Sequence, residues 1–217
     1  MPDAILFDLD GTLVDSIALI VAAMRHAFRG RARAPVTDQE WLATVGLPLH
    51  AQLRPYADTD ADVATLITEY RAFQVVHHDA LLRPYPGAVD VVRTLHERGH
   101  PLAVVTSKSE DMAHRALDWG GLARYFSAVV GLESTTYHKP DPAPIRFALH
   151  ALGAAAATAW FVGDSPFDMQ AGRGAGTRTV AALWGPFTRA DLEPTRPDAW
   201  AKRIEDVPAI VETRAAS

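Results

Sequence analysis

Short apolar runs alternate with amphipathic helical patterns along most of this chain, and one long interval breaks the alternation. The predicted strands are Ala4–Asp10, Leu102–Thr106, Ala128–Val130, Ala159–Gly163 and Thr179–Leu183. The predicted helices are Ala88–Glu97, Glu110–Trp119, Ile145–Leu152, Pro166–Arg173 and Glu205–Val211. Because strands that alternate with helices form βαβ units, the pattern predicts an α/β fold with a Rossmann-like parallel sheet and helices on both faces.

The interval from Val14 to Arg83 contains no convincing strand. Its helix-like segments are Ile17–Phe28, Asp38–Thr44 and Asp62–His77. Two prolines and a glycine in residues 84–87 then mark the return to the alternating pattern. We therefore expect residues 1–13 and 84–217 to form an α/β core domain, and residues 14–83 to form an inserted α-helical cap domain.

The composition excludes several classes of protein. With 217 residues, of which 48% are hydrophobic and 22% charged, the chain can bury a substantial core. Its net charge of −5 argues against nucleic-acid binding, and no apolar stretch approaches the ~18 residues of a membrane span. The chain has no cysteine, which excludes disulfides and thiolate catalysis, and shows no signal peptide. We expect a cytoplasmic protein that binds neither nucleic acid nor membrane.

Two acids stand at the end of the first predicted strand. The apolar run 4–7 leads to Asp8 and Asp10, and Gly11 and Thr12 follow at once. Open α/β sheets bind their ligands at the carboxyl ends of strands, where burying carboxylates without a partner is costly. A helix cap and a turn would explain one of these acids but not both.

Other strand ends carry hydroxyls and further acids. Thr106 ends the second predicted strand and Ser107 follows it. Hydroxyls and helix-start N–H groups at this place suit phosphate oxygens, although an ordinary helix cap would give the same pattern. Asp164 follows the fourth predicted strand. Asp168 falls in the first turn of the next helix, where the helix dipole favours a carboxylate.

A lysine completes the set. Pro140 restricts the backbone of Lys139 to extended conformations, which gives the lysine side chain a defined direction. Four acids gathered at one edge of a sheet repel one another unless a cation lies among them, and oxygen ligands without cysteine favour Mg2+. Acids, Mg2+, a lysine and an anion-binding hydroxyl together suit phosphoryl transfer, in which an aspartate nucleophile can form an aspartyl-phosphate.

These segments resemble the four motifs of the haloacid dehalogenase superfamily. The matching residues, in the same order along the chain, are 8–15, Thr106, Lys139-Pro140 and 163–168. The inserted helices resemble the small cap of that superfamily. The pattern is most similar to phosphoglycolate phosphatase-like and pyrophosphatase-like hydrolases, which implies a Mg2+-dependent phosphatase acting on a small phosphorylated metabolite, as a monomer or homodimer.

The resemblance implies a catalytic role for four residues. Asp8 would be the nucleophile, and Asp10 would protonate the leaving oxygen and then activate the hydrolytic water. Thr106 would bind a phosphate oxygen, and Lys139 would neutralise Asp8 and the transferring group. The resemblance also implies that relatives cleaving carbon–halogen bonds lack an acid at the position of Asp10, which argues against a dehalogenase.

The resemblance also implies a metal site. Asp164 would hold Mg2+ together with Asp8 and the carbonyl group of Asp10. Asp168 would hold metal-bound water or orient Lys139.

Substrate binding is expected from both parts of the chain. Gly11, Thr12 and Ser107 are the candidates in the core. The candidates in the cap are Gly46, Leu47 and His50, with Leu49 and Arg54 close by. Because two leucines offer a sugar ring no hydrogen bonds, we expect compact phosphates such as phosphoglycolate or pyrophosphate to be preferred to hexose phosphates.

Two other functions fit part of the pattern. A sugar-phosphate mutase of the same fold would call for polar, arginine-bearing residues in the cap loop 44–50, where this chain has Leu47, Pro48 and Leu49. A non-catalytic phospho-accepting or binding module would lack both the cap and Asp10.

Some residues are expected to be structural. We expect the pair His77-His78 on a solvated cap face, and Trp119 and Trp160 in the core. The glycines at 172–176 are expected to end a helix. Trp184 follows a predicted strand and could border the pocket.

Overall fold

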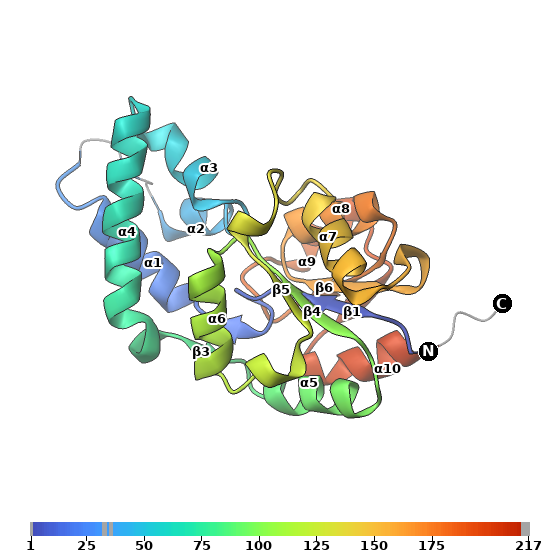
Figure 1. The fold of residues 1–217 in the computed structure, drawn as a ribbon. Helices are drawn as coiled ribbons and strands as arrows, with labels where there is room; N and C mark the ends of the chain where they lie inside the picture. Colours follow the sequence, from blue (N-terminus) through green and yellow to red (C-terminus); the bar gives the residue numbers. More distant parts are fainter. Residues whose placement is uncertain (1, 32–33, 35–36, 214–217) are drawn as a thin grey trace.

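The structure, a computed structural model, describes residues 2–31, 34 and 37–213. Its centre is a six-stranded sheet in the order β5-β4-β1-β6-β7-β8, in which every pair of neighbours is parallel (Figure 1). The strands are β1 Ile5–Phe7, β4 Leu102–Val105, β5 Ala128–Val130, β6 Trp160–Gly163, β7 Arg178–Ala182 and β8 Ala199–Ala201. The predicted α/β fold with a parallel sheet is confirmed.

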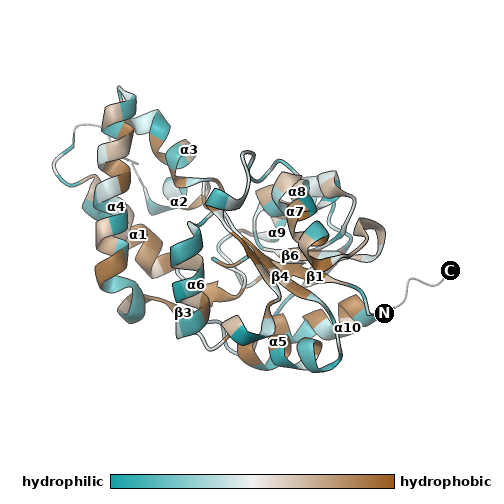
Figure 2. Ribbon diagram, viewed as in Figure 1, coloured by the Kyte–Doolittle hydropathy of each residue, from teal (hydrophilic) through white to brown (hydrophobic). Residues whose placement is uncertain are grey.

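Helices cover both faces of the sheet because its central strands are apolar on both sides. Along β1, Ile5 and Phe7 pack on one face, against α5 Ala88–Glu97, α6 Glu110–Trp119 and α10 Val207–Glu212. Leu6 packs on the other face, against α7 Ala143–Leu152 and α8 Pro166–Ala175. Figure 2 shows the apolar strands between helices whose outer surfaces are polar. A sheet buried in this way needs continuous apolar strands.

All five predicted strands are present, but β1 is shorter than Ala4–Asp10, so Asp8 and Asp10 lie in the loop that follows it. The sequence analysis missed β8, because its sequence Ala-Trp-Ala lacks the paired valines that mark β5. It also missed two short strands in the linkers to the helical insertion, β2 Val14–Asp15 and β3 Arg83–Pro84, which pair antiparallel. The short helix α9, Arg189–Leu192, was likewise not predicted.

In its described residues, the predicted helical insertion has four α-helices, which gather at one end of the molecule (Figure 1). They are α1 Ile17–Ala27, α2 Asp38–Leu42, α3 Leu49–Leu53 and α4 Asp60–Leu81, and α3 was not predicted. α1 packs along α4, and the insertion has an apolar core of its own around Trp41, Leu53 and Leu66. We propose that this group, called the insertion below, is the cap.

Two expectations about single residues are wrong. Trp119 is 49% exposed at the end of α6, where its Nε1 donates a hydrogen bond to the Leu82 carbonyl. His78 is buried, because it continues the inward face of α4 that carries Tyr70 and Gln74 at four-residue spacing. Trp160 is buried as expected.

Gly176 ends α8 with a φ of 86°, as expected for the glycines at 172–176. None of the helices in the part of the chain described above is long and apolar enough to cross a membrane.

Candidate active site

Three predicted site residues directly follow neighbouring strands. Asp8 follows β1, Thr106 follows β4 and Asp164 follows β6. The register aligns Phe7 with Val104 on one side and with Val162 on the other, so the three strands end side by side. Parallel strands thus deliver these side chains to one edge of the sheet, near the point where the chain crosses from one side of β1 to the other.

Lys139 lies between two acids at this edge. Its Nζ is 2.7 Å from Asp8 Oδ1 as an ion pair, and donates a hydrogen bond to Asp168 Oδ1 at 2.6 Å. The lysine is only 2% exposed. Burial lowers the pKa of Lys139, but the charges of Asp168 and Asp8 outweigh it and leave the pKa raised. The ammonium group therefore stays charged at neutral pH.

Asp168 is held by the start of α8. Its Oδ2 accepts hydrogen bonds from the backbone N–H of Ser165 at 3.0 Å and from the Ser165 hydroxyl at 2.6 Å. Gly163 leaves room for it, because a Cβ there would lie 2.4 Å from the Asp168 Cβ. Both carboxylate oxygens are thus engaged, and the geometry favours the orienting role for Asp168 over metal binding.

Asp164 has one satisfied oxygen and one without a partner. The Thr12 hydroxyl donates to Asp164 Oδ1 at 2.7 Å. Asp164 Oδ2 is buried and accepts no hydrogen bond from any residue that the structure describes. Gly11, at a φ of 84°, passes so close that a Cβ would lie 2.5 Å from this oxygen.

Thr12 and Gly11 therefore shape the surroundings of Asp164, and neither is among the residues that line the pocket described below. Their contact with substrate stays a prediction. Thr12 is fully buried, and its carbonyl accepts a hydrogen bond from Trp184 Nε1 at 2.9 Å. Trp184 thus holds this loop through a hydrogen bond, and it is not among the residues that line the pocket described below.

The carboxylates fit a divalent cation. Ligand oxygens of Asp8, Asp164 and Asp168 all lie within 4.8 Å of one another. Burial and, after it, the charge of Asp168 raise the pKa of Asp8 to about 7, because the two effects together outweigh Lys139, which lowers it. Burial also raises the pKa of Asp164 well above its usual value. Hard oxygen donors that carry more negative charge than one lysine can balance suit a cation such as Mg2+.

Asp10 lies apart from that cluster. Lys108 Nζ donates to both of its carboxylate oxygens, at 2.6 and 2.7 Å, and the Ser16 hydroxyl donates to Oδ1 at 2.6 Å. The carboxylate of Asp10 is thus engaged by Lys108 and Ser16, and the metal contact predicted for its backbone carbonyl stays a prediction. Lys108 was missed because a lysine after a Thr-Ser pair has no distinguishing pattern.

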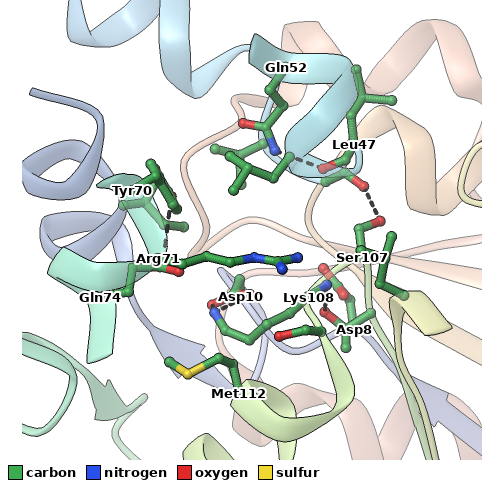
Figure 3. Close-up of a pocket in the computed structure, with 17 residues that line it drawn as sticks. Asp8, Asp10, Leu47, Gln52, Tyr70, Arg71, Gln74, Ser107, Lys108 and Met112 are labelled. Carbon is green, nitrogen blue, oxygen red and sulfur yellow. Dashed lines mark hydrogen bonds and ion pairs between the residues drawn. The ribbon is translucent and has the colours of Figure 1, made fainter. Parts of the chain in front are cut away.

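A pocket opens above these groups, between the sheet edge and the insertion (Figure 3). Its floor comes from the core and includes Asp8, Asp10, Thr106, Ser107 and Lys108. Its roof comes from the insertion and comprises Ile20, Val45, Gly46, Leu47, Leu49, Gln52, Tyr70, Arg71 and Gln74.

Two expected substrate contacts differ in the structure. His50 is exposed on α3 and does not line the pocket, because α3 turns Leu49 and Gln52 inward instead. Ser107 lines the pocket, but its hydroxyl donates to the Gly46 carbonyl at 2.6 Å and so connects the core to the insertion. Gly46 and Leu47 line the pocket as expected. Arg54 is exposed, and its guanidinium donates to the Ala57 carbonyl.

Sequence reasoning missed the residues that α4 brings to the roof: Tyr70, Arg71 and Gln74. A signal for Tyr70 and Gln74 exists in the sequence. The buried face of α4 runs through Val63 and Leu66 and then turns polar at Tyr70, Gln74 and His78. Polar residues that continue an apolar helix face mark the place where the helix leaves a core and meets a site.

Comparisons with known proteins match both the core and the insertion. The family model of haloacid dehalogenase-like hydrolases matches residues 5–182. The pyrophosphatase PpaX of Anoxybacillus flavithermus is 34% identical over 209 residues, which cover 96% of each chain.

Solved structures are similar over the same extent. A haloacid dehalogenase-like hydrolase from Streptococcus pneumoniae is 26% identical, with a TM-score of 0.84 over 96% of this chain and 98% of that one. A predicted phosphoglycolate phosphatase from Haemophilus somnus shares the fold, with a TM-score of 0.88 at 24% identity over 97% of this chain and 98% of that one.

Proposed function

Since the chain belongs to the haloacid dehalogenase-like hydrolase family and is a phosphatase, we propose that it hydrolyses compact phosphorylated anions through an aspartyl-phosphate, with Mg2+ as cofactor. The observation that carries the proposal is the buried group of Asp8, Lys139 and Asp168 beside the unpartnered oxygen of Asp164. This group offers one nucleophile and one fixed cation at the floor of the pocket.

In the first half-reaction, a carboxylate oxygen of Asp8 attacks phosphorus and the bond from phosphorus to the leaving oxygen breaks. Asp10 gives its proton to the leaving oxygen. Lys139, held by Asp168, neutralises charge on the transferring group, and the Thr106 hydroxyl donates to one of its oxygens. The product of this step is an acyl phosphate on Asp8.

In the second half-reaction, Asp10 takes a proton from a water molecule, which attacks phosphorus. The bond between phosphorus and Asp8 breaks, and inorganic phosphate leaves the pocket. The same acid that lost its proton in the first step regains one in the second, so the enzyme returns to its starting state.

Asp8 and Asp164 would hold Mg2+, which supplies positive charge to the phosphoryl oxygens. Asp164 is prepared for this role because Thr12 occupies only one of its oxygens. Asp168 keeps Lys139 in place from the other side.

The roof of the pocket supports a preference for small substrates. Ile20, Val45, Leu47 and Leu49 line it with apolar surface. Against these four side chains, the hydroxyls of a hexose would lose water without gaining hydrogen bonds. We therefore propose phosphoglycolate-like esters or pyrophosphate as substrates. The mutase alternative calls for polar residues in the loop 44–50, and the loop residues that line the pocket are Val45, Gly46, Leu47 and Leu49.

The test is a panel of phosphorylated compounds assayed with the purified chain and Mg2+. We expect phosphate release from phosphoglycolate or pyrophosphate, loss of activity in EDTA, recovery with Mg2+ and inhibition by Ca2+, whose looser coordination misplaces the reacting atoms.

Asp8→Asn should abolish turnover while the protein stays folded, and Asp111→Asn, an exposed acid on α6, is the matched control. Full activity after dialysis against EDTA would contradict the role of the metal. More than a few per cent of activity in Asp8→Asn would contradict the nucleophile, and a tenfold lead of a hexose phosphate would contradict the substrate class.

A further inference from the structure

Arg71 is a cation of the pocket roof that the mechanism above does not use. It lies on α4, and Figure 3 shows its side chain reaching across the pocket, with the guanidinium pointing toward the side where Ser107 and Asp8 lie. The residue is exposed. Within the described ranges, Arg71 forms no hydrogen bond and no ion pair with another residue.

The other cations around the site are engaged. Lys108 forms an ion pair with Asp10 through two short hydrogen bonds. Lys139 lies between Asp8 and Asp168. Of the two cations that line the pocket, all of whose lining residues the structure describes, Arg71 is thus the one with its charge available to a bound molecule.

The position of Arg71 relative to the nucleophile decides which part of a substrate it can meet. In phosphoryl transfer the attacking and leaving oxygens lie roughly in line with phosphorus between them. Because Asp8 lies in the floor, the leaving group extends away from the floor, into the space under the roof. Arg71 lies on α4 in the roof and reaches into this space, where the leaving group would lie.

We propose that Arg71 binds a negatively charged group on the leaving group, and that the enzyme selects phosphates whose leaving group carries its own anion. The planar guanidinium matches the two oxygens of a carboxylate or a phosphate. The neighbouring polar side chains are less available, because the Gln52 amide donates to the Leu47 carbonyl and Gln74 is buried beside Tyr70. This inference rests on the proposed function and adds to it the charge of the leaving group.

Three phosphate esters with two-carbon leaving groups separate charge from size. Phosphoglycolate has a negative leaving group, ethyl phosphate a neutral one and phosphoethanolamine a positive one, and pyrophosphate tests whether phosphate replaces carboxylate. We expect Arg71→Gln to lower kcat/KM for phosphoglycolate and pyrophosphate by about 10- to 100-fold, mostly through KM, as for other hydrogen bonds between charged groups. Turnover of ethyl phosphate should change less than about twofold, because Arg71 has no partner on it.

Two further variants keep the result interpretable. Arg71→Lys retains the positive charge without the planar pair of N–H donors, and it should recover part of the lost kcat/KM. Arg29→Gln changes another exposed arginine of the insertion and should leave kcat/KM unchanged for all four substrates. Thermal midpoints of the variants should match that of the wild type.

The proposal and the proposed function fail in different ways. Equal loss for all substrates in Arg71→Gln, or a wild type that prefers ethyl phosphate to phosphoglycolate, would overturn the role of Arg71 and leave the phosphatase intact. A loss for only one of phosphoglycolate and pyrophosphate would identify which anion Arg71 accepts. No phosphate release from any compound in the series would overturn both.

Discussion

The two sides of the pocket differ in how their charges are balanced. On the core side, Lys139, Asp168 and Ser165 form a chain of contacts, and Lys108 closes on Asp10. On the side of the insertion, the lining is mostly apolar and its one cation, Arg71, has no partner in the described structure. The core side is therefore organised before substrate binds, whereas the roof obtains its electrostatic partner from the substrate itself.

This difference separates chemistry from selectivity. Side chains that are fixed by one another act on the phosphoryl group, which every substrate shares. Side chains without partners act on the leaving group, which varies. Changes on the core side should therefore affect all substrates alike, and changes in the roof should affect them unequally.

The largest effect is expected on the core side, at Asp10. Asp10→Asn removes the proton carrier of both half-reactions, and general acid–base catalysis is typically worth about 10²- to 10⁴-fold in kcat. The loss should be the same for phosphoglycolate and ethyl phosphate, measured under saturating substrate. Asp15→Asn, an exposed neighbour in β2, is the control. A loss below tenfold would contradict the role of Asp10 as proton carrier. A loss confined to a single substrate would contradict the expectation that changes on the core side affect all substrates alike.

The next effect concerns the stability of the metal-free protein. Folding raises the pKa of Asp8 from its usual 3.8 to about 7, mainly through burial. The folded state therefore holds a proton that the unfolded state has lost. The stability contributed by protonated Asp8 is complete below pH 3.8 and falls as the pH rises through about 7. Between pH 5 and pH 8 the free energy of unfolding should decrease by about 3 kcal/mol from this group.

Urea unfolding in EDTA measures this slope. Asp8→Asn, which stays neutral, should be more stable than the wild type at pH 8 and similar to it at pH 5. Added Mg2+ should raise the free energy of unfolding of the wild type at pH 8 but not that of the variant, since a ligand stabilises only the form that binds it. If the two proteins unfold with the same pH dependence, Asp8 is not a strained buried carboxylate.

The smallest effect is expected where the two sides meet. Ser107→Ala removes the hydrogen bond from the Ser107 hydroxyl to the Gly46 carbonyl, which joins the core to the insertion. A neutral hydrogen bond contributes about 0.5–1.5 kcal/mol, so KM should rise about two- to tenfold with kcat nearly constant. The rise should be equal for all substrates. A large fall in kcat would instead place Ser107 on the phosphoryl group.

The sheet and the core side of the site could be predicted because both leave strong local patterns. Asp8, Thr106 and Asp164 stand directly after apolar strands, and parallel strands must end at the same edge. The capping box of Ser165 and Asp168 is also visible in the sequence, as a serine followed three residues later by an acid.

The roof could not be predicted in the same way, because its residues are brought together by helix packing rather than by strand ends. His50 seemed a candidate, but the direction in which α3 faces decides that Gln52 points inward instead. Arg71 follows Tyr70 on α4, and nothing in a helical repeat tells which exposed arginine faces a pocket. The hydrogen bond from Thr12 to Asp164 could not be predicted either, because it joins residues 152 positions apart in the chain.

The linkers of the insertion enter and leave the core side by side. Val14 pairs with Pro84 and Asp15 with Arg83, so the two connections lie one strand spacing apart, about 5 Å. A segment with adjacent ends can be exchanged for another without opening the fold that carries it, as in proteins that tolerate inserted domains. Evolution or a protein engineer could thus replace the helices between β2 and β3 as a unit and give the same phosphoryl-transfer chemistry a new set of substrates.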